Sequence, residues 1–135
     1  MVEVQLYGDA AGGSRSTAGK SDYEVIRDFF RTETGFRVTH KVRSTNPPVR
    51  DRVNAVNAML CNSYGIRRLS IDPRCRQLIR DLERVSWKAD NHGNLGARLD
   101  KSNPELTHTS DALGYLVERE FGLHPTGGFR AHFIG

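Results

Sequence analysis

Asp111 and His108 are the residues of this chain whose types and spacing most clearly suggest chemistry. They stand at the start of a predicted amphipathic helix, where a purely structural helix needs neither a carboxylate nor an imidazole. The helix dipole and the free N–H groups of a first turn keep a carboxylate ionised, which suits a metal ligand. Asp111 is therefore a candidate ligand, and His108 could orient that ligand or a water molecule. Ordinary capping by Asp111 and a surface role for His108 are the alternatives.

The predicted apolar stripe of the same helix leaves Asp111 on another face, together with Tyr115 and Glu118. The spacing of the stripe is i, i+3, i+4 and i+8, which is typical of one side of an α-helix. Its members are Leu113, Leu116, Val117 and Phe121. We therefore expect Asp111 to point away from the core contacts of its own helix.

A second carboxylate, Asp9, follows directly after a predicted strand. Residues 2–7 alternate between apolar and polar side chains and stop at Gly8, which indicates a half-buried strand. In open sheets with helical crossovers, ligands gather at the carboxyl ends of the strands. Asp9 therefore stands where a ligand of such a sheet would bind.

Strand and helix patterns alternate along the chain and predict an α/β fold, with a central and mainly parallel sheet flanked by helices. The expected strands are residues 2–7, 36–42 and 69–71, and the expected helices follow Ser21, Pro48, Pro73 and Thr107. The helix at Ser21 carries a capping box with Glu24, and Asp72 caps the helix after Pro73. Residues 87–105 are expected to form a long loop or a weak hairpin. Because three strands make a thin sheet and the chain begins on a strand, we expect the first strands to be absent or supplied by another chain.

The two middle helices are expected to bury apolar stripes and to expose arginines. The stripes are Val49, Val53, Val56 and Leu60, and then Cys75, Leu78, Ile79, Leu82 and Val85. Arg50, Asp51 and Arg52 fall on the polar face, where Asp51 would pair with a neighbouring arginine. Cys61 and Cys75 lack a metal-type spacing, so both are expected to be reduced core thiols of an intracellular protein.

Size and composition bound the class of protein. With 135 residues and 37% apolar content, the chain is expected to form one domain, residues 1–124, followed by a tail at residues 125–135. No segment approaches the ~20 apolar residues of a membrane helix, and the N-terminus lacks a signal-peptide pattern. We therefore expect a soluble cytosolic protein with no membrane partner.

Positive charge is concentrated between Arg37 and Lys88. This block holds twelve Lys and Arg against four Asp and Glu, a net charge of +8, whereas the remainder of the chain is −4. Such a block favours a polyanionic partner, and the absence of interleaved aromatic residues favours the backbone of double-stranded DNA. The candidate DNA-binding residues are Arg43, Arg50, Arg52, Arg74, Arg76 and Arg80. The alternative is that exposed arginines merely keep the protein soluble.

The glycine-rich segment 13–21 resembles a phosphate-binding P-loop because it ends in Gly19-Lys20-Ser21 and lies between a strand and a helix. A P-loop needs four residues between its two glycines so that successive N–H groups wrap the phosphates, and here five residues intervene. No strand offers a convincing Mg²⁺-binding aspartate of the Walker B type. We therefore expect no nucleotide-binding site.

Four ordered motifs resemble the C-terminal nuclease domain of the large terminase subunits of tailed bacteriophages, over roughly residues 2–121. The motifs are residues 7–12 with 14–17, residues 46–57, residues 78–83 and residues 107–115. The resemblance implies an RNase H-like fold and a two-metal endonuclease, using Mg²⁺ or Mn²⁺, that cuts concatemeric viral DNA during packaging. It also implies a portal protein and a small terminase subunit as partners, in the cytoplasm of the infected bacterial host. Asp9 would correspond to the family's second metal-binding carboxylate, and Asp111 to its third.

The chain departs from the family pattern in one important respect. The first carboxylate of the family lies on an earlier strand, in a motif resembling Trp-Asp-Phe-Asn, and no such segment occurs here. The ATPase domain is not present either, so the chain resembles a C-terminal fragment or the product of a split gene. Two-metal hydrolysis needs carboxylates that hold both ions, so the isolated chain is expected to cut slowly or not at all. The opposing hypothesis is a non-catalytic remnant that binds DNA or docks to a protein.

Overall fold

The computed structural model describes residues 1–15, 17 and 19–122, and the expected tail at residues 125–135 lies outside them. In this part of the chain the fold is mixed α/β, with four α-helices and two small sheets. The helices are α1 (Asp22–Phe29), α2 (Val49–Leu60), α3 (Arg76–Arg84) and α4 (His108–Phe121). The strands are β1 (Glu3–Leu6), β2 (Arg37–His40), β3 (Trp87–Ala89) and β4 (Leu95–Leu99). Short helical turns cover Ala10–Gly13, Phe30–Thr34 and Pro104–Leu106.

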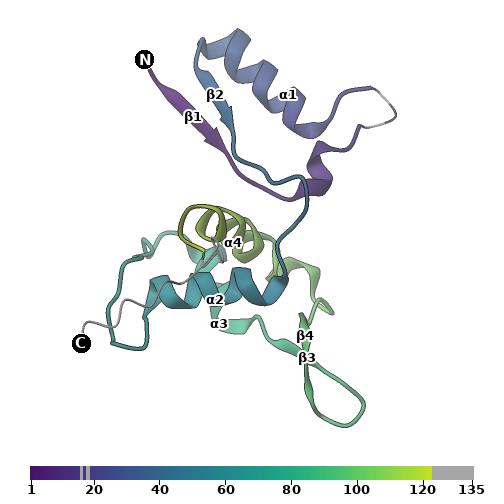
Figure 1. Ribbon diagram of the computed structural model, residues 1–135, viewed down its shortest axis with the longest axis vertical. Coiled ribbons are helices and arrows are strands. Elements are labelled where there is room, and N and C mark those ends of the chain that lie inside the picture. The colour runs from purple at the N-terminus through teal and green to yellow at the C-terminus, as the bar shows by residue number, and fades with distance from the viewer. Residues whose placement is uncertain (16, 18, 123–135) are drawn as a thin grey trace, which may run out of the picture.

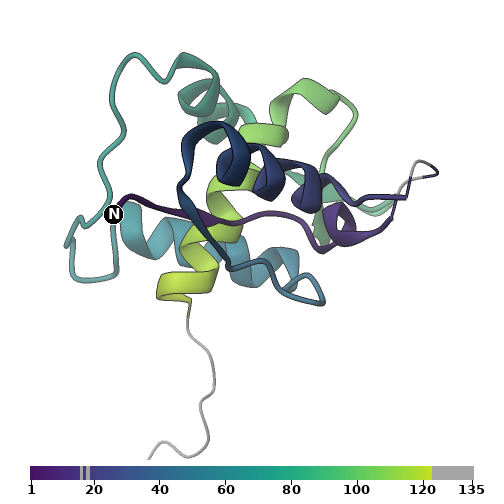
Figure 2. The ribbon, with the colours of Figure 1, turned by 90° about the horizontal axis from the view of Figure 1, so that it is seen from above.

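The N-terminal part is a β–α–β unit built on strong local signals. Ser21 caps α1: its hydroxyl accepts the N–H of Glu24, whose carboxylate accepts the N–H of Ser21 at 2.7 Å. The predicted capping box is therefore confirmed. Strands β1 and β2 pair in parallel, from Glu3 opposite Arg37 to Leu6 opposite His40. The pair lies between α1 and α4 (Figures 1 and 2).

The apolar core lies instead among the later helices. Helices α2 and α4 pack against each other, and α3 packs against α4. The buried cluster is Ala55, Val56, Met59 and Val117, with Leu60, Leu69, Leu82 and Leu113 packed around it. Strands β3 and β4 form an antiparallel hairpin that projects from this helical part, as Figure 1 shows. The hairpin alternative for residues 87–105 is thus confirmed.

Two expectations about secondary structure and packing are wrong. Residues 69–71 are not a strand, because the N–H groups of Arg68 and Leu69 both donate to the carbonyl of Met59 at the end of α2. The segment is thereby tied to a helix rather than to a sheet. Cys61 and Cys75 are free thiols but exposed rather than buried, because α3 begins only at Arg76 and leaves Cys75 as its N-terminal flank.

The exposed faces of α2 and α4 also differ from expectation. On α2 the buried residues include Arg52, which was expected on the polar face. On α4 the buried residues are Gly114, Val117 and Glu118, while Leu116 and Phe121 are exposed. The polar face of α4 therefore packs against other parts of the chain, because the β–α–β unit supplies charged partners for it.

Helix α4 joins the two parts of the molecule through polar side chains. Glu118 accepts both Nε and Nη2 of Arg43 at 3.1 Å, and Glu120 accepts the Tyr7 hydroxyl at 2.8 Å and Lys41 Nζ at 3.2 Å. The contacts between the β–α–β unit and α4 that we describe are therefore mainly ionic and hydrogen-bonded. In the described part of the chain, none of the helices combines the length and apolar character that crossing a membrane requires.

Candidate functional site

Asp9 follows β1 and caps the turn Ala10–Gly13. Its Oδ1 accepts the backbone N–H of Ala11 at 2.7 Å and the side-chain amide of Asn46 at 2.8 Å, and its Oδ2 accepts the hydroxyl of Tyr115 at 3.0 Å. Asn46 also accepts the N–H of Ala10 at 2.7 Å. The hydrogen bonds from Asn46 and Ala11 hold the pKa of Asp9 below its ordinary value, so Asp9 is a carboxylate at neutral pH.

Two glycines give the loop around Asp9 its shape by letting Tyr23 approach the backbone. The Tyr23 hydroxyl donates to the carbonyl of Asp9 at 2.5 Å. A Cβ at Gly12 would lie 2.8 Å from two ring carbons of Tyr23, and a Cβ at Gly8 would collide with the hydroxyl. Glycine is needed at both positions because only a residue without a Cβ leaves room for this ring.

Asp111 lies in the first turn of α4 and is held by two cations. Arg52 Nη1 approaches its Oδ1 at 2.9 Å, and Lys101 Nζ approaches its Oδ2 at 3.0 Å. Arg52 is only 5% exposed and packs beside Gly114, where the missing side chain leaves space for its stem. Asp111 therefore faces α2, because Arg52, its arginine partner, belongs to that helix.

Tyr115 connects the two carboxylates. The guanidinium carbon of Arg52 lies 4.4 Å from the centre of the Tyr115 ring, and the hydroxyl of the same ring donates to Asp9. Burial raises the pKa of Tyr115 to about 12, so this hydroxyl keeps its proton at neutral pH. The structure thus joins Asp9 to Asp111 through a phenol and a stacked arginine, which sequence reasoning did not foresee.

The remaining candidates stand apart from this network. His108 is the first residue of α4 and is exposed, with no hydrogen bond to Asp9 or Asp111 among the described residues. Asp51 is exposed and does not pair with Arg52, which pairs with Asp111 instead. Asp72 accepts from the backbone and side chain of Arg74, so it shapes the turn before α3 and does not cap that helix directly.

Asp81 is a carboxylate that sequence reasoning missed. It has no exposed surface and accepts the N–H groups of Thr109 and Ser110 at 3.0 and 3.2 Å, the Thr109 hydroxyl, and the Gln77 amide at 3.1 Å. It therefore caps α4 from the neighbouring helix α3. The sequence could have indicated its burial, because Asp81 lies three residues after Leu78, beside the apolar stripe. A carboxylate at such a position is buried and needs hydrogen-bond partners.

The predicted DNA-binding arginines fall into two classes. Arg43 is bound to Glu118, Arg52 is buried against Asp111, and Arg74 is paired with Asp72 at 2.9 Å. Arg50, Arg76 and Arg80 are exposed and have no ion pair within the described part of the chain. The expectation of an exposed Arg52 is therefore wrong, because its charge is satisfied inside the fold.

A cavity of about 180 Å³ adjoins Asp111 between α2, α4 and the hairpin. Its charged lining residues are Arg52 and Asp111, which are bound to each other. The rest of the lining is Val53, Val56, Asn57, Leu82, Val85, Trp87, Leu99, Ser110 and Gly114. Because the one cation of this lining is already neutralised, the cavity does not suit a phosphate group.

The donor atoms near the network suit a hard divalent cation, but their number is small. Asp9 and Asp111 offer carboxylate oxygens, the ligands that Mg²⁺ and Mn²⁺ prefer. Among residues 1–15, 17 and 19–122, no group of three or more His, Cys, Asp or Glu side chains is placed to hold a metal ion. Asp9 and Asp111 are linked only through the Tyr115 ring and the Arg52 guanidinium, so the described side chains by themselves do not form a metal centre. Searches of protein-family models, curated proteins and solved structures found no match to this chain.

Replacing Asn46 with alanine is expected to raise the pKa of Asp9 towards its ordinary value, since Asn46 is the main cause of its depression. A depressed carboxylate pKa stabilises the fold above the unfolded-state pKa, and this contribution is lost as the pH falls through the folded-state pKa. The variant should therefore be less stable than wild type at pH 7, with a smaller difference below pH 3. Carbon-13 NMR titration of the Asp9 carboxyl measures the pKa directly, and an unchanged value would contradict the assignment.

Proposed function

We propose that this chain is part of the nuclease domain of a phage terminase large subunit, with an RNase H-like fold, and that it acts on double-stranded viral DNA with Mg²⁺ or Mn²⁺. The observation that carries the proposal is the chain of contacts that links Asp9 to Asp111 through Tyr115 and Arg52. Asp9 is bonded to Tyr115, which lies 106 positions later, and Tyr115 stacks on the arginine that holds Asp111. These are the two positions to which the motif resemblance assigns metal ligands.

The side chains around these carboxylates have distinct parts in the proposed function. Asn46 and Tyr115 fix both oxygens of Asp9, while Arg52 and Lys101 fix both oxygens of Asp111. Such hydrogen bonds hold the carboxylates in one orientation before a ligand arrives. Asp9 and Asp111 would hold the divalent ion, which when bound supplies Lewis-acid assistance to phosphodiester hydrolysis.

A second candidate function is a non-catalytic module that binds DNA or docks to the portal protein or the small terminase subunit. It is favoured by the ion pairs of Asp111, because Arg52 and Lys101 already neutralise this carboxylate. The two candidates share the family and a location in the infected bacterial host. They differ in whether the two carboxylates accept a metal ion.

Binding of Mn²⁺ is expected to raise the melting temperature of the wild-type chain, because a ligand that binds only the folded state stabilises it by mass action. The stabilisation is about 2.7 kcal/mol at a metal concentration one hundred times Kd. Asp9→Asn and Asp111→Asn should each remove the rise, measured against the metal-free melting temperature of the same variant. Asp90→Asn is the matched control, since Asp90 lies in the β3–β4 turn and should leave the rise intact.

Plasmid nicking in Mn²⁺ then separates the two candidates. Wild-type chain that binds Mn²⁺ and nicks slowly, with loss of both properties in Asp9→Asn, supports the nuclease. An equal thermal shift in wild type and all three variants excludes this pair as the metal site. Strong nicking that survives Asp9→Asn places the catalytic centre elsewhere.

A further inference from the structure

The positively charged side chains fall into two groups, those in ion pairs with carboxylates of the chain and those without such a pair. Most cations of the β–α–β unit and of its junction with α4 are in ion pairs. The paired cations are Lys20, Arg27, Arg31, Lys41, Arg43, Arg52, Arg74 and Lys101. Between residues 66 and 84 the arginines other than Arg74 have no ion pair in the described part of the chain, and all are exposed. The free positive charge of the basic block is therefore concentrated on and around α3.

Helix α3 arranges three of these arginines in a row. Arg76, Arg80 and Arg84 recur every four residues, so they share one face of the helix and follow one another about 6 Å apart along its axis. We call these three residues the arginine row. The buried Asp81 lies on a neighbouring side of α3, and Leu82, which packs against the core, lies on the side opposite the row. The row therefore faces solvent because the core requires the other side of the helix.

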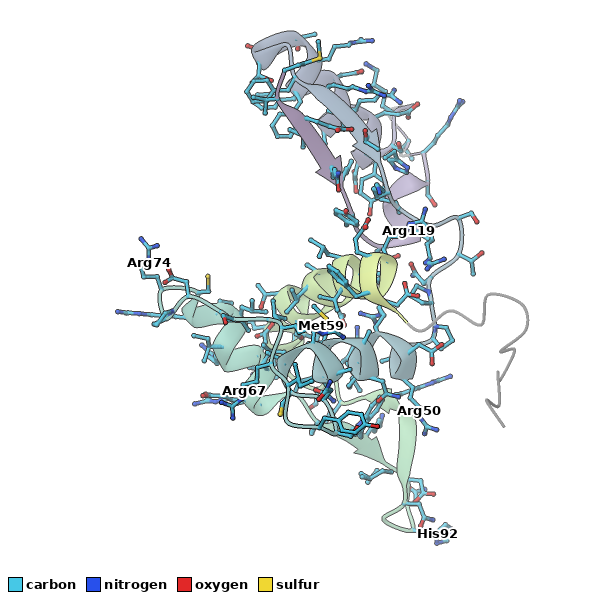
Figure 3. All side chains as sticks on the ribbon, turned by 60° about the vertical axis from the view of Figure 1, so that its left-hand side comes forward. Arg50, Met59, Arg67, Arg74, His92 and Arg119 are labelled. Carbon is cyan, nitrogen blue, oxygen red and sulfur yellow. The ribbon has the colours of Figure 1, made fainter. Side chains whose placement is uncertain are left out.

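The surroundings add to the positive charge of the row. Arg67 and Arg68 precede α3 in an exposed loop, and Figure 3 shows Arg67 and Arg74 on the same side of the molecule, away from Arg50. Of the three acidic residues in segment 66–84, Asp72 is bound to Arg74 and Asp81 is buried. Only Glu83 is left, against five exposed arginines. The surface consequently carries a local net charge of +4.

We propose that the arginine row docks this domain on the sugar–phosphate backbone of double-stranded DNA. Arginine presents a planar fork of N–H donors that matches phosphate oxygens, and it binds them more specifically than a point charge does. The row spans roughly 12 Å, which covers several phosphates because one strand of duplex DNA advances about 3.4 Å per phosphate. No aromatic residue lies on α3 to stack on unpaired bases, so the surface fits a duplex.

Hydrogen bonds connect the arginine row to the candidate site. The inference therefore rests on the proposed function, and it identifies the surface by which DNA would bind. Asp81, next to Arg80 in sequence, binds the N–H groups of Thr109 and Ser110 in the first turn of α4. Asp111 belongs to the same turn. A duplex docked on α3 would therefore be held in a fixed relation to Asp111 by the hydrogen bonds that the buried Asp81 accepts.

The test compares a triple variant, Arg76→Ala with Arg80→Ala and Arg84→Ala, with wild-type chain. Fluorescence anisotropy measures affinity for a 30-base-pair duplex over a range of salt concentrations. Each lost phosphate contact should reduce the slope of log K against log salt by about 0.9, so the triple variant should lose about 2.7. Its affinity at moderate salt should fall at least tenfold. The matched control replaces Arg27, Arg31 and Arg37, which removes the same charge from the β–α–β unit and should change the slope far less.

Every outcome bears on the proposal. A triple variant with the wild-type slope, a control that loses as much, or no duplex binding by folded wild-type chain overturns it. Preferential binding of phosphatidylserine vesicles, or of single-stranded DNA of equal length, overturns it in favour of those partners. Circular dichroism checks that each variant is folded. Binding through the row without any Mn²⁺ effect would leave the docking surface intact and refute the nuclease, whereas Mn²⁺-dependent nicking unchanged in the triple variant would do the reverse.

Discussion

Asp81→Ala is expected to lower the free energy of unfolding by about 3–5 kcal/mol, because several buried donors lose their acceptor and each unsatisfied donor costs about 1–3 kcal/mol. Asp81 is fully buried and accepts two backbone N–H groups at the start of α4, together with the Thr109 hydroxyl and the Gln77 amide. Without the carboxylate these donors stay buried and lack an acceptor, which is the costly part of the change. Urea unfolding measures the effect as a lower midpoint with an unchanged slope.

The matched control for Asp81 is Glu83→Ala on the same helix. Glu83 is exposed and makes no ion pair in the described part of the chain, so its replacement should change stability by about 0.5 kcal/mol or less. Asp81→Asn should fall between the two, because the amide keeps one acceptor oxygen but loses the charge. If Asp81→Ala and Glu83→Ala unfold at the same urea concentration, Asp81 does not cap α4.

The second large effect is the change in stability caused by replacing Asp111, whose sign separates two roles for this residue. Asp111→Asn is expected to destabilise the chain by about 2–4 kcal/mol, because it leaves the buried guanidinium of Arg52 without its carboxylate. A carboxylate kept only for metal binding would behave in the opposite way, since removing a functional charge commonly raises stability. Thermal and urea unfolding without metal decide between the two signs.

A double-mutant cycle completes this test. Arg52→Met keeps much of the side-chain volume and removes the charge, so Arg52→Met with Asp111→Asn should recover most of the stability that Asp111→Asn loses. A coupling energy above about 1 kcal/mol is expected for residues in such close contact. Asp51→Asn should be nearly neutral, because Asp51 is exposed and makes no ion pair with the described residues. A stabilising Asp111→Asn would show that the Arg52 contact does not hold the fold together.

Elements with a local physical cause could be predicted from the sequence. The capping box of Ser21 and Glu24 fixes the start of α1, and the proline pair before Val49 fixes the start of α2. The strand at residues 3–6 follows from its alternation of side chains. Each of these signals depends on residues a few positions apart, so the rest of the fold is not needed to interpret them.

Features that depend on distant partners were missed. Arg52 was expected in solvent because helical spacing cannot reveal a carboxylate 59 residues away, or the glycine that makes room for its stem. Residues 69–71 have the composition of a strand, but the carbonyl at the end of α2 takes their neighbouring N–H groups. Asp9 and Asp111 became candidates through their positions at a strand end and a helix start and through the motif resemblance, whereas the phenol and guanidinium that connect them appear only in three dimensions.

The polar junction between α4 and the β–α–β unit implies that the two parts of the molecule do not unfold in a single cooperative step. In residues 1–15, 17 and 19–48, Ser21 is the only buried residue, while the apolar cluster lies at residues 55–117. Ionic strength weakens the ion pair of the exposed Glu120 more than that of the buried Glu118, and it leaves the apolar cluster unaffected. We therefore expect β1, β2 and α1 to open as a separate cooperative unit, with amide protons that exchange at a lower free energy than those of α2 and α4. If the chain binds double-stranded DNA as we propose, the counterions around the duplex would change how firmly the β–α–β unit, and with it Asp9, is attached to α4.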